Sequence, residues 1–367
     1  MKSFRFRRIS TFAILLVLSL LLASCGNFFG GVDETNIEKV AEYYYAPGKK
    51  EMPSGKKTYH LLSEKSRAQV GEEAWVKDSE FLAPDNAVKV LRKEEVRGTT
   101  YALVSIIGMV HGNGMDSAGN IVTKEWKDIR THSWILENGK WRLLSFPKTS
   151  EEVNRAFNNG DYAAAKAKAE EWLTLDPFSI SAYGNLIFAI ARGGRTLPKE
   201  GARSVHDIVR AVLAVNPEDT RANFIAVSYT EDRAIAKSLL ARLKETTYNT
   251  TAAINVAQKY GDPRARLAFL KEQDRDAGLD FMKAITFAEL KRWGEFREIA
   301  LNKSFIESMK NFLDVQDTSQ AAGTSAELGL CFIGADDRAN ARLWFEYGVS
   351  KDPNNPKIRR LGRALER

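Results

Sequence analysis

The sequence is poor in the residues that build disulfide or metal-based scaffolds. Its 367 residues include only two cysteines and four histidines. This excludes a disulfide framework and a cysteine-rich zinc site. Because the histidines also lack the spacing of zinc ligands, we expect no metal and no cofactor.

The net charge of the protein is also small. The formal net charge is +7, but Lys2, Arg5, Arg7 and Arg8 lie at the very N-terminus, and subtracting these four charges leaves +3. This is too weak to predict binding to nucleic acid. With 44% hydrophobic and 28% charged residues, the composition is that of a globular protein, which excludes wholesale disorder, collagen and a polytopic membrane protein.

The N-terminus carries a targeting pattern. After the basic residues comes an apolar run, Ile9 to Leu22, shorter than the ~20 residues that span a bilayer. It is typical of a secretory signal. The run ends in Leu22, Ala23, Ser24 and Cys25, which resembles the lipobox of bacterial lipoproteins. The alternative is an ordinary signal peptide that ends in an unrelated cysteine.

The lipobox resemblance implies a location. Residues 1–24 would be removed, Cys25 would carry acyl chains, and 25–31 would form the tether. Gly26 follows the cysteine, where aspartate retains many lipoproteins at the inner membrane. We therefore expect a lipid-anchored protein of the cell envelope, at the outer membrane of a diderm bacterium.

Residues 32–148 begin with helical patterns and continue with strands. The first helix is expected over 36–45, from the apolar stripe of Ile37, Val40, Ala41 and Tyr44. The segment Asn138-Gly139 predicts a tight hairpin turn, because both positions favour positive φ. Further helical pieces are expected over 59–62 and 66–77, and strands over 87–96, 99–111, 121–136 and 140–146.

This order, together with the Trp134–Leu143 hairpin, resembles the NTF2-like (cystatin-like, SnoaL-like) α+β cone, which encloses a pocket. No catalytic pair stands out. His111 in His-Gly-Asn-Gly and Asp116 are interpreted as turn residues. Alternating side chains on one strand form a candidate pocket ladder: Trp126, Asp128, Arg130, His132 and Trp134. The alternative is that this face meets solvent while Ile129, Thr131, Ser133 and Ile135 pack on helices.

Residues 149–367 lack strand patterns. Gly160-Asp161, three following alanines and Asp176-Pro177 resemble a tetratricopeptide repeat (TPR), whose unit is about 34 residues. The turn pattern returns at 261 and at 294–296, and helix-ending prolines return at 217 and 353. The pattern is unclear over 228–250, and 314–323 is predicted to be a polar connector. We expect about six hairpins in an all-α, TPR-like superhelical solenoid, which places a groove along its first helices.

Some TPR grooves clamp a peptide carboxylate with lysine, asparagine and arginine. Counting back from the helix-ending prolines, the matching positions hold Asn154, Asn185 and Arg221, whereas Ser150 and Ile225 do not fit. Chance is the alternative, since such residues are common on helix surfaces.

The leading hypothesis is a non-enzymatic, membrane-anchored lipoprotein that recruits a protein or peptide partner in the envelope through its TPR-like groove. The alternative is a small-molecule binder or weak enzyme with an NTF2-like pocket, whose solenoid serves for docking. The TPR-lipoprotein resemblance also allows a role as an accessory of peptidoglycan or outer-membrane assembly.

Overall fold

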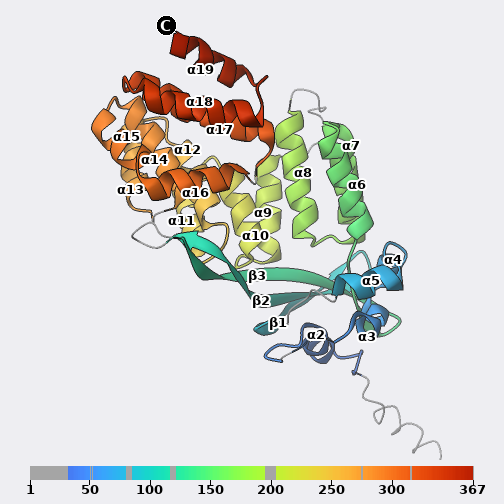
Figure 1. Cartoon of the computed structure of the whole chain (residues 1–367). Helices are drawn as coiled ribbons and strands as arrows, with labels where there is room; N and C mark the ends of the chain where they lie inside the picture. Colours follow the sequence, from blue (N-terminus) through green and yellow to red (C-terminus); the bar gives the residue numbers. More distant parts are fainter. Residues whose placement is uncertain are drawn as a thin grey trace, which may run out of the picture. The chain divides into compact units, whose positions relative to one another are not determined.

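The structure is a computed structural model that describes residues 32–49, 51, 53–79, 85–115, 121–194, 204–273, 276–314 and 316–366 (Figure 1). The predicted signal peptide, lipobox and tether lie outside these residues. The chain divides into two compact units. The first holds Met1–Val104 and Ser133–Ser145, and the second holds Ser105–His132 and Phe146–Arg367. None of the described helices combines the length and the apolar character that crossing a bilayer requires.

Short helices open the first unit. Asn36 begins the first of them, because its side chain accepts a hydrogen bond from the Lys39 amide at 3.1 Å. The helix ends at Ala46, which has a left-handed backbone. The predicted stripe of Ile37, Val40, Ala41 and Tyr44 is buried, as expected. The helices of this region are α2 (Ile37–Tyr45), α3 (Gly55–Thr58), η1 (Tyr59–Leu61), α4 (Glu64–Arg67) and α5 (Glu72–Ser79).

The strands follow in a meander, which confirms the predicted order of helices before strands. The described sheet has the order β1-β2-β3-β4. The turn at Asn138-Gly139 is confirmed, since both residues have positive φ. It pairs Glu137 with Lys140 and Trp134 with Leu143. The strands are β1 (Ala87–Val96), β2 (Thr99–Met115), β3 (Ile121–Glu137) and β4 (Lys140–Leu143).

One turn prediction in the sheet is wrong. His111 and the residues after it continue β2 to Met115. The His111 Nδ1 atom lies 3.3 Å from a carboxylate oxygen of Glu125 on β3. Pairing with the neighbouring strand has therefore overridden the local turn preference of Gly112 and Gly114. Asp116 lies outside the described residues.

The core of the first unit packs the α2 side chains together with the closing hairpin. Trp134 is fully buried and meets Tyr44 edge-on, with the ring centroids 5.7 Å apart. Leu62 forms a bridge with Leu143. These contacts establish an α+β unit of helices on a meander, whereas the NTF2-like cone stays a prediction.

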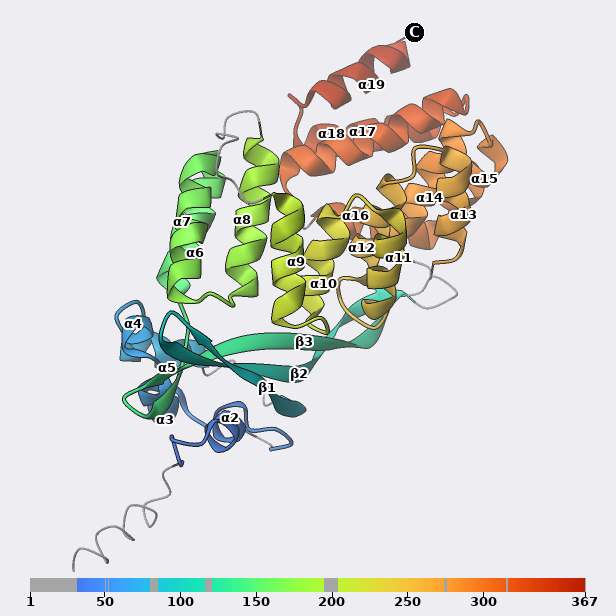
Figure 2. The ribbon, with the colours of Figure 1, turned by 180° about the vertical axis from the view of Figure 1, so that it is seen from behind.

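The second unit is dominated by helical hairpins that follow one another along the chain (Figures 1 and 2). In successive hairpins the first helix also contacts the first helix of the next, from α6 through α8, α10 and α12 to α14. This is the arrangement of a TPR-like repeat array. The hairpins are α6 (Pro147–Asn158) with α7 (Tyr162–Leu175), α8 (Ile180–Gly193) with α9 (Val205–Val215), α10 (Thr220–Tyr229) with α11 (Arg233–Arg242), α12 (Asn249–Gln258) with α13 (Pro263–Lys271), α14 (Ala277–Glu289) with α15 (Trp293–Ala300), and α17 (Thr318–Gly334) with α18 (Arg338–Lys351); α16 (Lys303–Asp314) and α19 (Pro356–Glu366) complete the array.

Most of the predicted helix ends are confirmed. Helices α7, α9 and α18 stop two residues before Pro177, Pro217 and Pro353, because proline cannot continue a helix. Gly160 turns with a φ of 71° and Asp161 caps α7. Asp262 likewise caps α13.

Two local predictions in the helical region are wrong. Gly294 lies inside α15, and the turn falls earlier, at Lys291, which has a φ of 55°. The expected connector 314–323 is mostly helix, because Asp317 caps α17 with hydrogen bonds to the amides of Ser319 and Gln320. A good capping residue has outweighed the polar composition.

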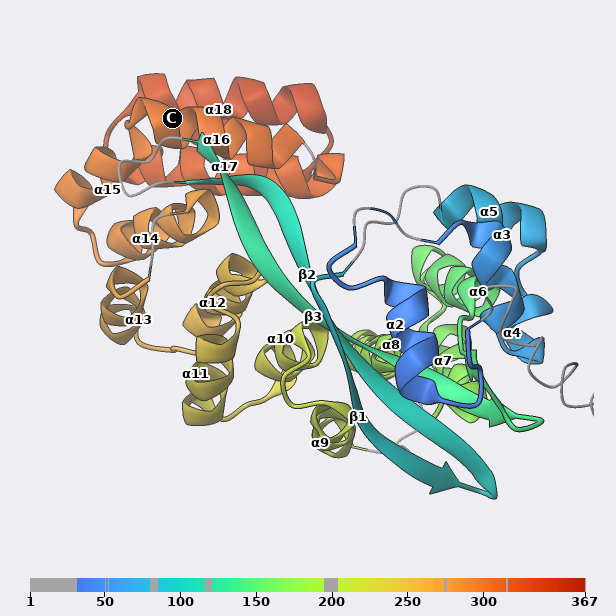
Figure 3. The same ribbon diagram turned by 90° about the horizontal axis from the view of Figure 1, so that it is seen from below.

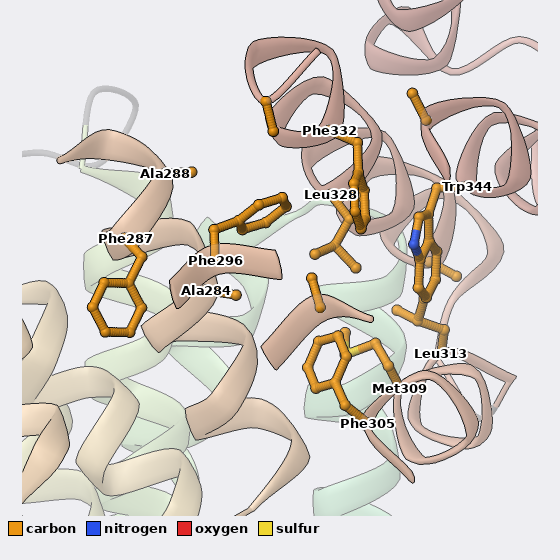
Figure 4. Packing of buried hydrophobic residues seen from close by; sticks show 14 of the residues in the cluster. Ala284, Phe287, Ala288, Phe296, Phe305, Met309, Leu313, Leu328, Phe332 and Trp344 are labelled. Carbon is orange, nitrogen blue, oxygen red and sulfur yellow. The ribbon is translucent and has the colours of Figure 1, made fainter. Parts of the chain in front are cut away.

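The C-terminal hairpins share an aromatic core (Figure 4). Phe296, Phe305, Phe332 and Trp344 are buried together there. Gly329 permits close packing, since a Cβ at that position would lie 2.3 Å from a methyl carbon of Leu361. Cys331 packs against this core, and burial raises the pKa of its thiol to about 12, so the thiol is unsuited to nucleophilic chemistry at neutral pH.

Candidate functional site

The predicted groove residues lie on three consecutive first helices. Asn154 is on α6, Asn185 on α8 and Arg221 on α10. Arg221 is exposed, and its guanidinium donates a 2.7 Å hydrogen bond to the Ser181 hydroxyl of α8. The structure thus links Arg221 directly to the helix that carries Asn185.

An aromatic pair joins α6 to α8 on the same side. Phe157 and Phe188 each lie three residues after one of the two asparagines, a spacing that keeps residues on one helix face. Their ring centroids are 5.0 Å apart in an edge-to-face arrangement. The Arg192 guanidinium lies over the Phe188 ring, 5.2 Å from its centroid. This surface therefore offers an aromatic and cationic contact beside the amides.

The same side continues onto α12 through residues that sequence reasoning missed. Asn255 donates a 2.9 Å hydrogen bond to the Ser228 hydroxyl of α10. The Lys259 ammonium donates to the Ser228 carbonyl at 3.2 Å. Burial lowers the pKa of Lys259, and the nearby Glu231 opposes this. Helical spacing could have indicated these residues, because Ser228 follows Arg221 by seven residues and Lys259 follows Asn255 by four, which places each pair on one helix face.

We call this surface the first-helix face. Its polar members come from helices that contact one another in series, α8 with α10 and α10 with α12. Its three cations are Arg192, Arg221 and Lys259, and the acid Glu231 lies near Lys259, so its net charge suits a segment that carries negative charge. The first-helix face consists of Asn154, Phe157, Ser181, Asn185, Phe188, Arg192, Arg221, Ser228, Asn255 and Lys259.

The residues of the candidate pocket ladder on β3 differ in their burial. Trp134 belongs to the aromatic core of the first unit, and its indole nitrogen has no hydrogen-bond partner in the described part of the chain. Trp126 and His132 are partly buried, whereas Arg130 is exposed and pairs with Asp128 at 3.3 Å. Burial raises the pKa of Asp128, which Arg130 opposes, and burial lowers the pKa of His132 to about 4.

Part of β3 also contacts the helical hairpins, and Figure 3 shows β3 running beside α10. The Thr220 hydroxyl accepts a 2.8 Å hydrogen bond from the Ile129 amide. The Asn216 amide donates to the hydroxyls of Thr131 at 3.0 Å and of Ser105 at 3.4 Å. The Lys127 amide donates to the Glu245 carbonyl at 2.9 Å. For Thr131, whose side chain accepts the bond from Asn216, this contact favours the alternative interpretation, in which that residue packs on helices.

The acidic residue nearest this contact is Asp219, the capping residue of α10. It is 2% exposed. Burial raises its pKa to about 6, although hydrogen bonds from the Ala222 amide and the Thr131 hydroxyl lower it. The Asp128 carboxylate raises it further. Ser105 on β2 and Thr131 on β3 are therefore joined to the turn between α9 and α10 through a buried polar cluster.

No arrangement of three or more metal-binding side chains occurs in the described residues. The chain matches no protein-family model and no curated protein. Among solved structures it is similar to a thermophilic TPR protein from Thermus thermophilus, with 15% identity over 60% of this chain and 99% of that chain and a TM-score of 0.32.

Two further solved structures show comparable likeness. YrrB, a TPR protein with an unusual peptide-binding site, has 13% identity over 59% of this chain and 90% of that chain, at a TM-score of 0.27. The human IFIT1 dimer with PPP-AAAA has 17% identity over 57% of this chain and 51% of that chain, at a TM-score of 0.36. Such low values carry no argument, so the description as a TPR-like array rests on the hairpins and turns of this chain.

Proposed function

We propose that the protein is a non-enzymatic, lipid-anchored component of the bacterial cell envelope that recruits a protein partner through its first-helix face. The single observation that carries the recruitment is the hydrogen-bonded series Arg221–Ser181, Asn255–Ser228 and Lys259–Ser228 across α8, α10 and α12. These bonds hold amide and cationic donors on adjacent helices before any partner arrives, which lowers the entropy cost of binding.

The favoured partner is an acidic or carboxylate-ended segment of an envelope protein. A guanidinium forms a fork of two hydrogen bonds with a carboxylate, and the bond that Arg221 makes to Ser181 leaves further donors for such a contact. Asparagine side chains add orientation without charge. The aromatic pair of Phe157 and Phe188 supplies apolar contact area for neighbouring side chains of the segment.

The anchor is the second part of the proposal and rests on the lipobox pattern at Leu22–Cys25. Cys25→Ser should release the protein from membranes, because the acyl chains hold it there. Metabolic labelling with an alkyne fatty acid tests this in the native bacterium. An unlabelled and uncleaved wild-type chain would contradict the anchor and leave the partner proposal standing.

Site-specific photo-crosslinking tests the recruitment. A photoreactive residue at Asn185 should capture a discrete envelope protein, whereas one at Arg210, exposed on the second helix α9, should not. Replacing Asn154, Asn185 and Arg221 together with alanine should reduce recovery of that partner at unchanged helical content. Equal capture from both positions would refute the assignment to the first-helix face.

The sheet provides the comparison variant. Replacing Arg130, which is exposed, should leave partner recovery intact. If this variant loses the partner and the triple variant keeps it, the roles of the two surfaces are reversed, and the small-molecule hypothesis gains support. The ladder residues that the structure describes do not share one environment, since Trp134 is a core residue and Arg130 faces solvent.

A further inference from the structure

A cavity opens on a different part of the helical array, between α13 and the turn that joins α14 to α15. Its volume is about 490 Å³, within the range of about 300 to 1,000 Å³ that small-molecule sites occupy. Helix α13 is the second helix of its hairpin, so the cavity is not part of the first-helix face. Figure 2 shows α13, α14 and α15 together. The lining residues are Arg264, Leu267, Ala268, Lys271, Leu290 and Arg292.

The lining combines exposed cations with apolar side chains, of which Leu267 is buried and Ala268 is exposed. Arg264 and Lys271 are seven residues apart, and Leu267 and Ala268 lie between them on the same stripe of α13. No carboxylate pairs with either cation in the described part of the chain. By contrast, Arg266 on the same helix lies 2.9 Å from a carboxylate oxygen of Glu289. Among the described residues, Arg264 and Lys271 therefore lack the close ion pair that Arg266 makes, and Lys271 acts on a carboxylate only at longer range, by helping Arg292 to lower the pKa of Glu295.

The third cation of the cavity is held in place. The Arg292 Nε atom donates a 2.8 Å hydrogen bond to Glu295. Its guanidinium also lies over the ring of Phe287, at 5.0 Å, and the Lys271 ammonium lies 5.8 Å from the same ring centroid. The hydrogen bond from Arg292 lowers the pKa of Glu295.

The charge balance at the cavity is positive. None of the described lining residues is acidic, and the single carboxylate of Glu295 interacts with both Arg292 and Lys271, which leaves a net positive charge among the three cations. Guanidinium groups bind carboxylate and phosphate through two parallel hydrogen bonds. The leucines and the alanine favour an apolar group beside that oxyanion, because its burial removes apolar surface from water.

We infer that this cavity binds a small organic oxyanion, a carboxylate or phosphate joined to an aromatic or aliphatic body. The oxyanion meets Arg264, Lys271 and Arg292, and the body covers Leu267, Ala268 and Leu290. This inference is independent of the partner proposal, because the two surfaces share no residue.

Calorimetric titration of the purified chain tests the inference with defined probes. Phenyl phosphate and phenylacetate should bind saturably. Inorganic phosphate and acetate, which lack the body, and benzyl alcohol, which lacks the charge, should bind at least about tenfold more weakly. Whichever aromatic anion binds more tightly identifies the oxyanion.

Variants locate the binding. Arg264→Gln with Lys271→Gln should weaken phenyl phosphate binding at least about tenfold. Lys303→Gln is the matched control, since Lys303 is 91% exposed on α16, and it should leave the affinity unchanged. If the double variant misfolds, phenyl phosphate binding is measured with each single variant, since both positions are exposed. The inference would be overturned if neither phenyl phosphate nor phenylacetate binds saturably. It would also be overturned if Lys303→Gln weakens phenyl phosphate binding as much as the Arg264→Gln and Lys271→Gln changes do.

Discussion

Replacing Asp219 with asparagine should stabilise the helical unit at neutral pH and leave it nearly unchanged near pH 4. Asp219 is almost completely buried, and the charge of Asp128 on β3 adds to the rise of its pKa. Asparagine removes the charge but keeps an oxygen that caps α10 by accepting from Ala222. It also keeps an acceptor for the Thr131 hydroxyl.

The magnitude follows from the pKa. Burial raises the pKa of Asp219 from 3.8 to about 6, and at about 1.4 kcal/mol for each pH unit this corresponds to about 3 kcal/mol. Because the folded-state pKa lies above the unfolded value, the native state binds the proton more tightly. Stability through this group is greatest below pH 4 and is lost as the pH rises through about 6. This pKa already includes the favourable hydrogen bonds that the charged form accepts at the start of α10, so we expect a gain of about 3 kcal/mol at pH 7.5.

Urea unfolding followed by circular dichroism, at several pH values from 4 to 7.5, measures this difference. Asp232→Asn is the matched control, because Asp232 caps α11 through two backbone amides but is exposed. The control should show no gain that grows with pH. If Asp219→Asn and the wild type keep the same difference in unfolding free energy from pH 4 to 7.5, burial does not disfavour the charge of Asp219 and the reasoning is wrong.

Three further changes test the packing of each unit. Gly329→Ala should cost about 1 to 3 kcal/mol, because its Cβ would overlap Leu361; an unchanged urea midpoint would contradict close helix packing there. Glu34→Ala should cost about 3 kcal/mol, since it leaves Arg142 without the carboxylate that lies 2.7 Å away in a largely buried pair; thermal unfolding measures this, and Glu38→Ala, at an exposed position, is its control. The fragment 149–367 should be helical by circular dichroism but less stable than a chain that keeps 105–132; a strand-dominated or disordered spectrum would refute its independent folding.

Part of the candidate site followed from spacing in the sequence. The spacing relative to Pro177 and Pro217 predicts Asn185 and Arg221 on first helices, because the repeat fixes the distance from the end of one hairpin to the next. Their role in binding stays a prediction. The bonds from Asn255 and Lys259 to Ser228 were missed, since the turn pattern over 228–250 is weak and gives no register for α12.

The compact units of the structure do not follow the boundary that local sequence patterns suggest. A change of residue texture near position 148 predicted one contiguous strand domain and one contiguous helical domain. Contacts instead group residues 105–132 of the strands with the helices. The residue composition of a segment indicates its local preference for helix or strand. Which segments form one compact unit depends instead on the side chains that come into contact after folding. Whether 149–367 folds alone is a separate question that the fragment tests.

The sequence by itself determined the local features whose cause is local. Asn138-Gly139 adopts its turn because both residues tolerate positive φ, prolines at 177, 217 and 353 follow helix ends, and alternation or helical spacing selects each buried face. Only the tertiary structure decided which distant groups meet. The bond between Asn216 and Thr131 joins residues 85 positions apart, and Arg264 and Arg292 share a cavity because α13 packs on α14. Such contacts depend on register and packing between elements, which no periodicity within one element encodes.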